Sequence, residues 1–278
     1  MKYGVQLYSL RQYLKDEKGY ERIFGILKDM GVEVVQLSST GSNPIDSTFL
    51  SNLVKESGIS ICGTHSPFQR ILNDLDNLAL EHLQYGCDEI GIGMMPNEFK
   101  ANSFAKLDEF ISILNEKSKH LKQYNITLAY HNHWFEFKDI GGTTPMERIL
   151  KETDVNIIPD TFWMKFAGED PIEYLKKLDG RVKTVHLKDY KKTLGIPVFR
   201  ALGKGILDFR TILDISKDIK AENAVIELDV SPNPIKSIEF SFDYLNKIKG
   251  WRFLFSLFYY IYALNDINWF DLYFVSSN

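Results

Sequence analysis

The sequence has few cysteines and no excess of positive charge. Only Cys62 and Cys87 occur in 278 residues, too few to hold such a chain together by disulfides and without zinc-finger spacing. We therefore expect both to be reduced, buried thiols in a cytoplasmic protein. The 33 Lys and Arg residues against 37 Asp and Glu give a net charge of −4, which argues against nucleic acid as a partner.

Signals for export and for common nucleotide sites are also missing from the sequence. The opening residues MKYGVQLYSL alternate like a strand and lack the apolar run of a signal peptide. No GxGxxG or GxSxG motif occurs, and residues 203–205 (GKG) lack the spacing of a phosphate-binding loop. We interpret the GKG segment as a turn into a helix that starts near Asp208, and the lysine-rich residues 188–192 as a solvent-exposed loop.

Residues 251–278 differ in composition from the rest of the chain. They hold 11 of the 37 aromatic residues and only three charged residues. Their longest uncharged run, residues 253–265, has 13 residues, fewer than the ~17–25 that a transmembrane helix needs. We expect an atypical C-terminal extension with no transmembrane span. A shifted reading frame, an interface helix and a membrane-surface helix all stay open as its origin or role.

Residues 1–250 alternate regularly between strand and helix patterns. Helix starts are marked by an N-cap residue before Pro, as at Thr144-Pro145 and Asp170-Pro171, and helix ends by glycines such as Gly58. The expected strands are residues 3–7, 32–37, 59–65, 89–93, 126–131, 155–160, 182–188 and 224–229. Eight βα units in about 250 residues predict one α/β domain, a (β/α)8 TIM barrel over residues 1–250. A doubly wound open sheet is the alternative.

Polar residues lie where four of these strands end, which is where such barrels place their active sites. Successive side chains of a strand face opposite sides, so His131, His186 and Glu227 are predicted to point into the barrel, with Asp160 ending the strand at 155–160. Each residue alone is more often a hydrogen-bonded structural group. Two imidazoles and two carboxylates in phase instead favour a divalent metal site, for Mn, Zn, Co or Mg.

Several motifs carry a resemblance to a known family. They are YHNHWFEF (130–137), PDTFW (159–163), VHLKD (185–189), GKGILDF (203–209) and IELD (226–229), together with the opening YGVQLYSLR. In this combination and order they resemble the sugar phosphate isomerase/epimerase family of the xylose isomerase-like TIM barrels, over residues 1 to about 249. The resemblance implies a divalent metal ion whose ligands fall on His131, Asp160, His186 and Glu227.

The resemblance also implies a class of reaction. We expect a divalent-metal-dependent isomerase, epimerase or dehydratase that acts on a keto-sugar, sugar phosphate or cyclitol through a metal-stabilised enediolate. Epimerases of this superfamily generally have Glu where His131 stands. The histidine therefore favours elimination or aldose–ketose isomerisation over epimerisation, as in relatives that dehydrate inososes or act on 3-keto sugars.

Roles follow for the other polar residues near the strand ends. Glu227 is the first candidate base and His133 the second, and Lys188 is a third catalytic candidate because its charge can neutralise an enolate. An ion pair between Lys188 and Asp189 is the structural alternative. The candidate substrate-binding residues are His65, Glu136, Trp163 and Asp189, and Glu136 can instead orient a histidine.

The expected partner is a small-molecule sugar, and a homo-oligomer stays open. Two other functions also stay open, namely an apurinic endonuclease-like metal hydrolase and a non-catalytic sugar-binding barrel. The acidic balance of charge argues against the endonuclease, and metal analysis separates the binding barrel from the enzyme.

Overall fold

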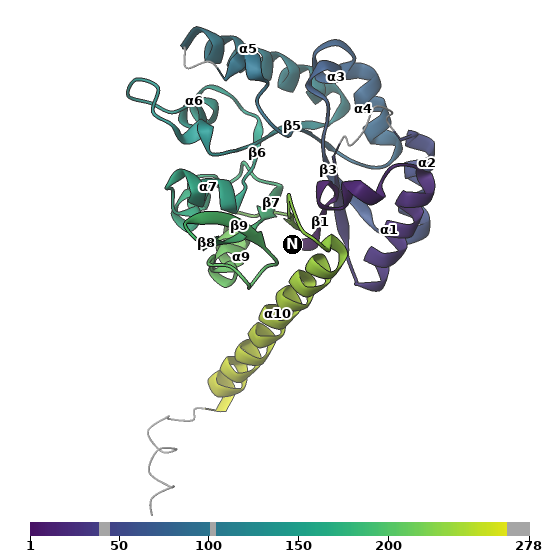
Figure 1. Cartoon of the computed structure of the whole chain (residues 1–278), viewed down its shortest axis with the longest axis vertical. Helices are drawn as coiled ribbons and strands as arrows, with labels where there is room; N and C mark the ends of the chain where they lie inside the picture. The colour runs from purple at the N-terminus through teal and green to yellow at the C-terminus, as the bar shows by residue number, and fades with distance from the viewer. Residues whose placement is uncertain (39–44, 101–103, 266–278) are drawn as a thin grey trace, which may run out of the picture.

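Eight parallel strands form the central sheet in this structure, a computed structural model. It describes residues 1–38, 45–100 and 104–265, with side chains through residue 249. The strand order is β6-β5-β4-β3-β2-β1-β10-β7. The two ends of that order meet at a parallel bridge between Asp160, just after β6, and His186 of β7. The sheet thus comes nearly to closure as a barrel with helices around it (Figure 1).

All eight expected strands are present, which confirms the α/β TIM barrel. The barrel strands are β1 (Lys2–Gln6), β2 (Val34–Ser38), β3 (Ser60–His65), β4 (Glu89–Ile92), β5 (Thr127–His131), β6 (Asn156–Ile158), β7 (Thr184–Leu187) and β10 (Asn223–Ile226). The helices are α1 (Glu17–Asp29), α2 (Ser47–Ser57), α3 (Phe68–Asn73), α4 (Leu75–Gln84), α5 (Phe104–Leu121), α6 (Pro145–Glu152), α7 (Thr161–Ala167), α8 (Pro171–Lys176), α9 (Phe209–Asp218) and α10 (Pro234–Asn265). Short 3-10 helices are η1 (Leu7–Tyr13), η2 (Asn97–Phe99), η3 (Lys122–Tyr124) and η4 (Phe135–Phe137).

Helix ends lie where the sequence predicts them. The Thr144 hydroxyl accepts from the amide of Glu147, whose carboxylate accepts from the amide of Thr144 in return, so a capping box starts α6. Gly58 follows α2 with a φ of 75°, a left-handed conformation that glycine adopts without a steric penalty. These local signals fix where each helix turns back toward the barrel.

The sequence analysis missed one pair of strands. β8 (Asp189–Thr193) and β9 (Ile196–Arg200) form an antiparallel hairpin, so residues 188–192 are not simply a loop. Lys191 and Lys192 are nevertheless exposed. The strand Asp189–Thr193 is short and lysine-rich, so its sequence has no alternating hydrophobic pattern that would indicate a strand.

The sequence analysis ends the barrel at residue 250, but the C-terminal helix α10 continues without a break through that position. Figure 1 shows this helix projecting away from the barrel. The rest of the expected extension, residues 266–278, lies outside the described residues. Among the helices that the structure describes, none is both long enough and apolar enough to cross a bilayer. The division into barrel and extension stays a prediction.

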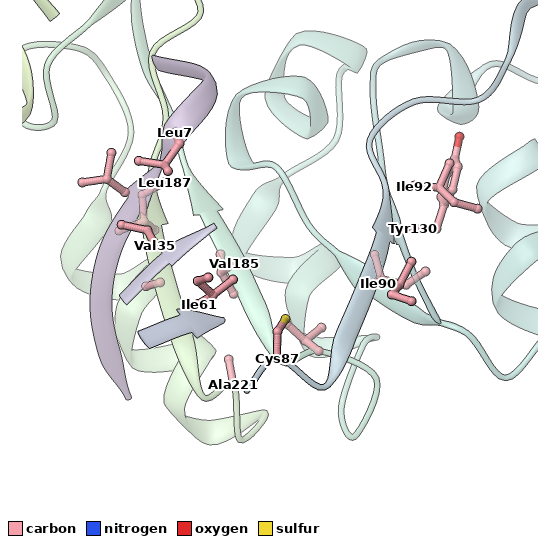
Figure 2. Packing of buried hydrophobic residues seen from close by; sticks show 14 of the residues in the cluster. Leu7, Val35, Ile61, Cys87, Ile90, Ile92, Tyr130, Val185, Leu187 and Ala221 are labelled. Atoms are coloured by element: carbon pink, nitrogen blue, oxygen red, sulfur yellow. The ribbon is translucent and has the colours of Figure 1, made fainter. Parts of the chain in front are cut away.

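Outward-facing strand side chains pack beneath the helices. Val185 and Leu187 of β7 are fully buried there, as is Val35 of β2 (Figure 2). Cys87 is buried in the same cluster, whereas Cys62 is only half-buried, and both are free thiols. The expectation of two buried thiols is therefore correct for Cys87 alone.

A carboxyl group is buried inside the barrel, on β4. Glu89 is fully buried, and its Oε2 accepts from Asn156 Nδ2 at 3.4 Å. Its Oε1 has no hydrogen-bond partner in the part of the chain that the structure describes. Burial, opposed by Lys183 and the Asn156 bond, raises the pKa of Glu89 to about 8.

This shift predicts a pH-dependent stability. Because the pKa of Glu89 exceeds the ordinary 4.5, its contribution to the free energy of unfolding is fully present below pH ~4.5 and is lost as pH rises through ~8. Glu89→Gln should flatten that decline and make the chain more stable by ~1–3 kcal/mol at pH 8. Urea unfolding from pH 5 to 9 measures it, with the exposed Glu98→Gln as control. An unchanged slope in Glu89→Gln would contradict the assignment.

Candidate metal centre and active site

The four predicted metal ligands converge at one end of the barrel. His131 ends β5, Asp160 follows β6, His186 lies on β7 and Glu227 follows β10. All four are buried, and one ligand atom from each lies within 4.8 Å of the others. Alternation along separate strands therefore does bring these side chains together, as the sequence analysis predicts.

The hydrogen bonds of His131 leave a lone pair facing a carboxylate. Its Nδ1 lies 3.1 Å from the carbonyl oxygen of Gly93, so Nδ1 must carry the hydrogen and Nε2 the lone pair. Nε2 lies 3.5 Å from Oδ2 of Asp160, and neither atom has a hydrogen-bond partner among the described residues. Two buried acceptors that face each other fit a cation between them.

His186 is oriented in the same way by a glutamine. Its Nε2 donates to Oε1 of Gln36 at 2.5 Å, and Gln36 Oε1 also accepts from Gln6 Nε2 at 2.7 Å. Nδ1 of His186 lies 2.8 Å from Oε2 of Glu227, a hydrogen-bond and ion-pair distance. A cation held between these two atoms would take the place of the proton in that hydrogen bond. The His, Asp and Glu donor set suits Mn, Zn or Co.

A buried lysine supplies positive charge beside the cluster. Lys188 Nζ lies 2.7 Å from Asp229 Oδ1, 3.4 Å from Asp160 Oδ2 and 3.5 Å from Glu227 Oε2. Burial opposes its charge, but the three carboxylates outweigh burial and hold the pKa of Lys188 above its ordinary value. Asp229 is the partner that the sequence analysis did not assign, although it lies two residues after Glu227 and so on the same face.

The alternative ion pair between Lys188 and Asp189 is wrong. Asp189 is buried, and its carboxylate accepts from five backbone amides. Their donors are Tyr190, Gly203, Gly205, Ile206 and Leu207. These bonds hold the segment between β9 and α9 in place. They favour a structural role for Asp189, while its predicted contact with substrate stays a prediction.

Two further histidines border the cluster. The His65 ring centroid lies 5.0 Å from that of His131 and 5.4 Å from that of His186, and the His133 centroid lies 4.9 Å from that of His131. Burial and then His131 lower the pKa of His133 to about 3. Burial and the neighbouring imidazoles likewise hold the pKa of His65 well below its ordinary value. Both rings are therefore neutral near neutral pH.

Glu136 is fully buried behind His133. Its carboxylate accepts from the Tyr130 hydroxyl and, at 2.9 Å, from the backbone amide of His133. Burial, opposed by these bonds, raises the pKa of Glu136 to about 7. These contacts favour the orienting role for Glu136 over the predicted contact with a sugar hydroxyl, which stays a prediction.

A cavity of about 400 Å³ opens above the cluster, within the usual size range of small-molecule sites. Its lining includes His65, His131, His133, Lys188, Glu227 and Asp229, with Tyr8, Arg11, Ser38 and Ser66 at other points of the wall. Trp163, predicted to contact the sugar, lines the adjacent cavity instead, and its backbone amide donates to Asp160 Oδ1 at 2.9 Å. The walls combine imidazole, carboxylate, ammonium and hydroxyl groups, which suits a polyhydroxylated ligand.

The fold and the buried donor cluster define an α/β barrel of the kind that builds metal sites at its strand ends. A family model described as xylose isomerase-like TIM barrel matches residues 24–248. The chain belongs to this family. The resemblance found in the sequence is confirmed.

Curated relatives that match part of the chain are inosose dehydratases. One from Clostridium tetani is 26% identical over 147 residues, which cover 46% of this chain and 49% of the relative. Another, from Mesomycoplasma hyopneumoniae, is 29% identical over 179 residues, covering 55% of this chain and 59% of the relative. The chain thus spans about half to three-fifths of the length of the curated relatives that it matches.

Solved structures share the fold over most of their length. A sugar phosphate isomerase/epimerase from Parabacteroides distasonis has a TM-score of 0.73 at 23% identity, covering 89% of this chain and 98% of that one. A probable 3-DHS dehydratase from Bacillus anthracis has a TM-score of 0.70 at 15% identity, covering 88% and 99%. At these identities the likeness shows the fold alone.

Gln36 generates a prediction, because it was missed by the sequence analysis and fixes the tautomer of His186. Gln36→Leu removes the acceptor and should weaken divalent-ion binding by ~10- to 100-fold, the usual effect of losing a hydrogen bond to a metal-binding histidine. Gln36→Glu keeps an acceptor oxygen and should retain most of the affinity. Competition titration with a chromogenic chelator measures both. Equal affinity in the wild type and Gln36→Leu would show that the amide has no such role.

Proposed function

We propose that this chain is a divalent-metal-dependent enzyme that removes a proton from a carbon beside a carbonyl in a keto-sugar, sugar phosphate or cyclitol. The observation that carries this proposal is the cluster of four buried side chains whose ligand atoms lie within 4.8 Å of one another, two of them without a hydrogen-bond partner among the described residues. His131, Asp160, His186 and Glu227 would hold the ion. The partial matches to inosose dehydratases support dehydration as the reaction.

Chemically, proton removal beside a carbonyl needs a base and a way to stabilise the negative charge that develops on oxygen. A divalent ion at the four residues would supply positive charge opposite that oxygen. Glu227 is the first candidate base: burial opposes its ionisation, but Lys188 and His186 hold its pKa well below the ordinary value. It is therefore ionised and has a site for a proton, and the same low pKa makes it a weak base. His133, neutral and at the cavity wall, is the second candidate.

Lys188 contributes a fixed positive charge to the cavity wall. Asp229 accepts from its ammonium at 2.7 Å and so holds Nζ in place. In this position the ammonium can offset negative charge on a substrate oxygen, or donate a hydrogen bond to a hydroxyl. Asp229 then acts through Lys188, as a positioning residue.

The histidine at position 131 bears on the kind of reaction. Epimerisation needs a base on each face of the reacting carbon, whereas elimination and aldose–ketose isomerisation can proceed with one. Of the two carboxylates in the cavity wall, Asp229 is paired with Lys188 at 2.7 Å, whereas Glu227 lies 3.5 Å from it. The Glu136 carboxylate already accepts from the Tyr130 hydroxyl and the His133 amide. We therefore propose that elimination or isomerisation outpaces epimerisation.

Metal content tests the first part of the proposal. Protein purified without chelator should contain close to one divalent ion per chain, because the buried donors face one another. Asp160→Ala and Glu227→Ala should each lose most of it, while the exposed Asp29→Ala should not. Inductively coupled plasma mass spectrometry after dialysis measures this. A stoichiometric ion that persists in the Asp160→Ala/Glu227→Ala double variant would contradict this site.

Proton exchange tests the chemistry. A keto-sugar or inosose substrate incubated with the enzyme in D₂O should exchange its α-hydrogen or lose it during dehydration, as followed by product NMR. Glu227→Gln should slow this step by ~10²-fold or more, the size expected for loss of a general base. The metal content of Glu227→Gln must be measured in parallel, to separate loss of a base from loss of an ion.

Two outcomes of that experiment would overturn the assignments. A wild-type rate in Glu227→Gln would exclude Glu227 as the base, and His133→Gln would then be tested. Epimer formation faster than dehydration and isomerisation across the substrate panel would contradict the proposed preference. Stoichiometric metal without any α-hydrogen exchange would instead favour a sugar-binding barrel.

A further inference from the structure

A second cavity, of about 550 Å³, lies beside the one above the metal cluster. The two cavities share Met94 and His133 in their walls. The other residues that line the second cavity are Met95, Phe99, Lys100, Leu107, Trp134, Phe135, Lys138, Ile140, Pro145 and Trp163. Because the first cavity is already large enough for a single sugar ring, the second one is space for a further part of the ligand.

The walls of the second cavity are aromatic and aliphatic. The Trp163 ring lies 5.2 Å from that of His133, and the Phe135 ring lies 5.8 Å from His133 on a nearly parallel plane. Trp134 meets Phe135 edge to face at 6.1 Å. Flat apolar walls of this kind favour a planar apolar group. A second sugar ring would leave many of its hydroxyl groups without hydrogen-bond partners, which is costly in a buried site.

Two ammonium groups add positive charge to this apolar cavity. Lys100 Nζ lies 4.7 Å from the Phe135 ring centroid, and Lys138 Nζ lies 4.4 Å from that of Trp134. Neither lysine forms an ion pair with any residue that the structure describes. Lys100 Nζ contacts the sulfur of Met94 at 3.1 Å, which is a weak acceptor. Lys100 also acts electrostatically on the buried Glu136, so an anionic ligand group would share the charge of Lys100 with Glu136 and meet that of Lys138 directly.

We propose that the second cavity binds an aromatic substituent carried by the sugar or cyclitol, with an acidic group on that ring facing Lys100 and Lys138. This inference rests on the proposed function for one point, namely that the rest of the ligand is a sugar or cyclitol. Binding of the aromatic part requires neither the metal nor catalysis. The ligand is then an aryl glycoside or aryl ether of a polyol, with the ring in the apolar cavity and the polyol above His131 and Glu227.

Calorimetric titration of the full chain with four β-glucosides tests this inference. The probes are methyl, phenyl and 4-carboxyphenyl β-glucoside, with cellobiose as the two-sugar alternative. Phenyl glucoside should bind at least ~10-fold more tightly than methyl glucoside, because burying a phenyl ring removes a large apolar area from water. The carboxylate should add a further ~3-fold or more, which is reduced by high salt.

Two variants connect such binding to this cavity. Ile140→Trp fills it and should abolish the preference for phenyl over methyl, while the half-buried Ile113→Trp on α5 serves as the matched control. Lys138→Gln should remove most of the gain from the carboxylate, with the exposed Lys151→Gln as control. Lys138 is exposed, so this variant remains informative even where Ile140→Trp impairs folding, which thermal unfolding reports.

The outcomes separate this inference from the proposed function. Equal affinities for the methyl and phenyl probes, tighter binding of cellobiose than of phenyl glucoside, or a phenyl preference that survives in folded Ile140→Trp would each overturn the inference. The titrations are repeated in Asp160→Asn, which removes a proposed metal ligand. A phenyl preference that persists there would show that the aromatic site binds independently of the metal ligands. A phenyl preference in a wild-type protein that holds no metal and exchanges no α-hydrogen would support the aromatic site while contradicting the proposed function.

Discussion

The bridge between Asp160 and His186 is the constraint on which the site depends. The backbone amide of His186 donates to the carbonyl of Pro159 at 2.9 Å, where the two ends of the strand order meet. Thr161 reinforces the junction, since its hydroxyl lies 3.1 Å from the carbonyl oxygen of His186 and accepts from the amide of Lys188 at 3.2 Å. The same contact therefore joins the two ends of the barrel and places two candidate metal ligands. Weakening it would open the barrel and move Asp160 away from His186.

Charge balance supports the proposal that a divalent cation binds at this junction. Asp160, Glu227 and Asp229 bring three carboxylates together, and Lys188 offsets one of them. Full ionisation of the three carboxylates beside the Lys188 ammonium would leave these four groups with a formal charge of about −2 in a largely buried cluster, which is costly without a counter-ion. Burial raises the pKa of Asp160 despite the nearby Lys188, so burial disfavours the charged form of this carboxyl group. A divalent ion would cancel the formal charge of the cluster.

Strand alternation made much of this predictable from the sequence. His131, His186 and Glu227 lie on separate strands, and the period of two fixes which side chains face inward without any knowledge of tertiary contacts. The same rule explains the error at Asp189: it follows Lys188 directly, so the two side chains face opposite sides of the chain. Lys188 therefore meets Asp229, which shares the inward face of its own segment with Glu227.

Contacts between distant segments could not be predicted in this way. Gln36 meets His186 across 150 positions of sequence, and a glutamine on a strand gives no local signal of such a partner. The hairpin of β8 and β9 likewise follows from pairing between two short segments rather than from a hydrophobic pattern. Side-chain partners that arise only when the barrel closes are thus the part of the site that the sequence leaves undetermined.

His133 connects the chemistry of the first cavity to the shape of the second. Its backbone amide donates to Glu136, and its ring contacts those of His131, Trp163 and Phe135. A substituent that packs on these aromatic rings would fix the distance of the attached polyol from Glu227. Binding energy gained in the second cavity would then align the reacting carbon with its base in the first cavity. This alignment would raise the reaction rate only for ligands that fill both cavities.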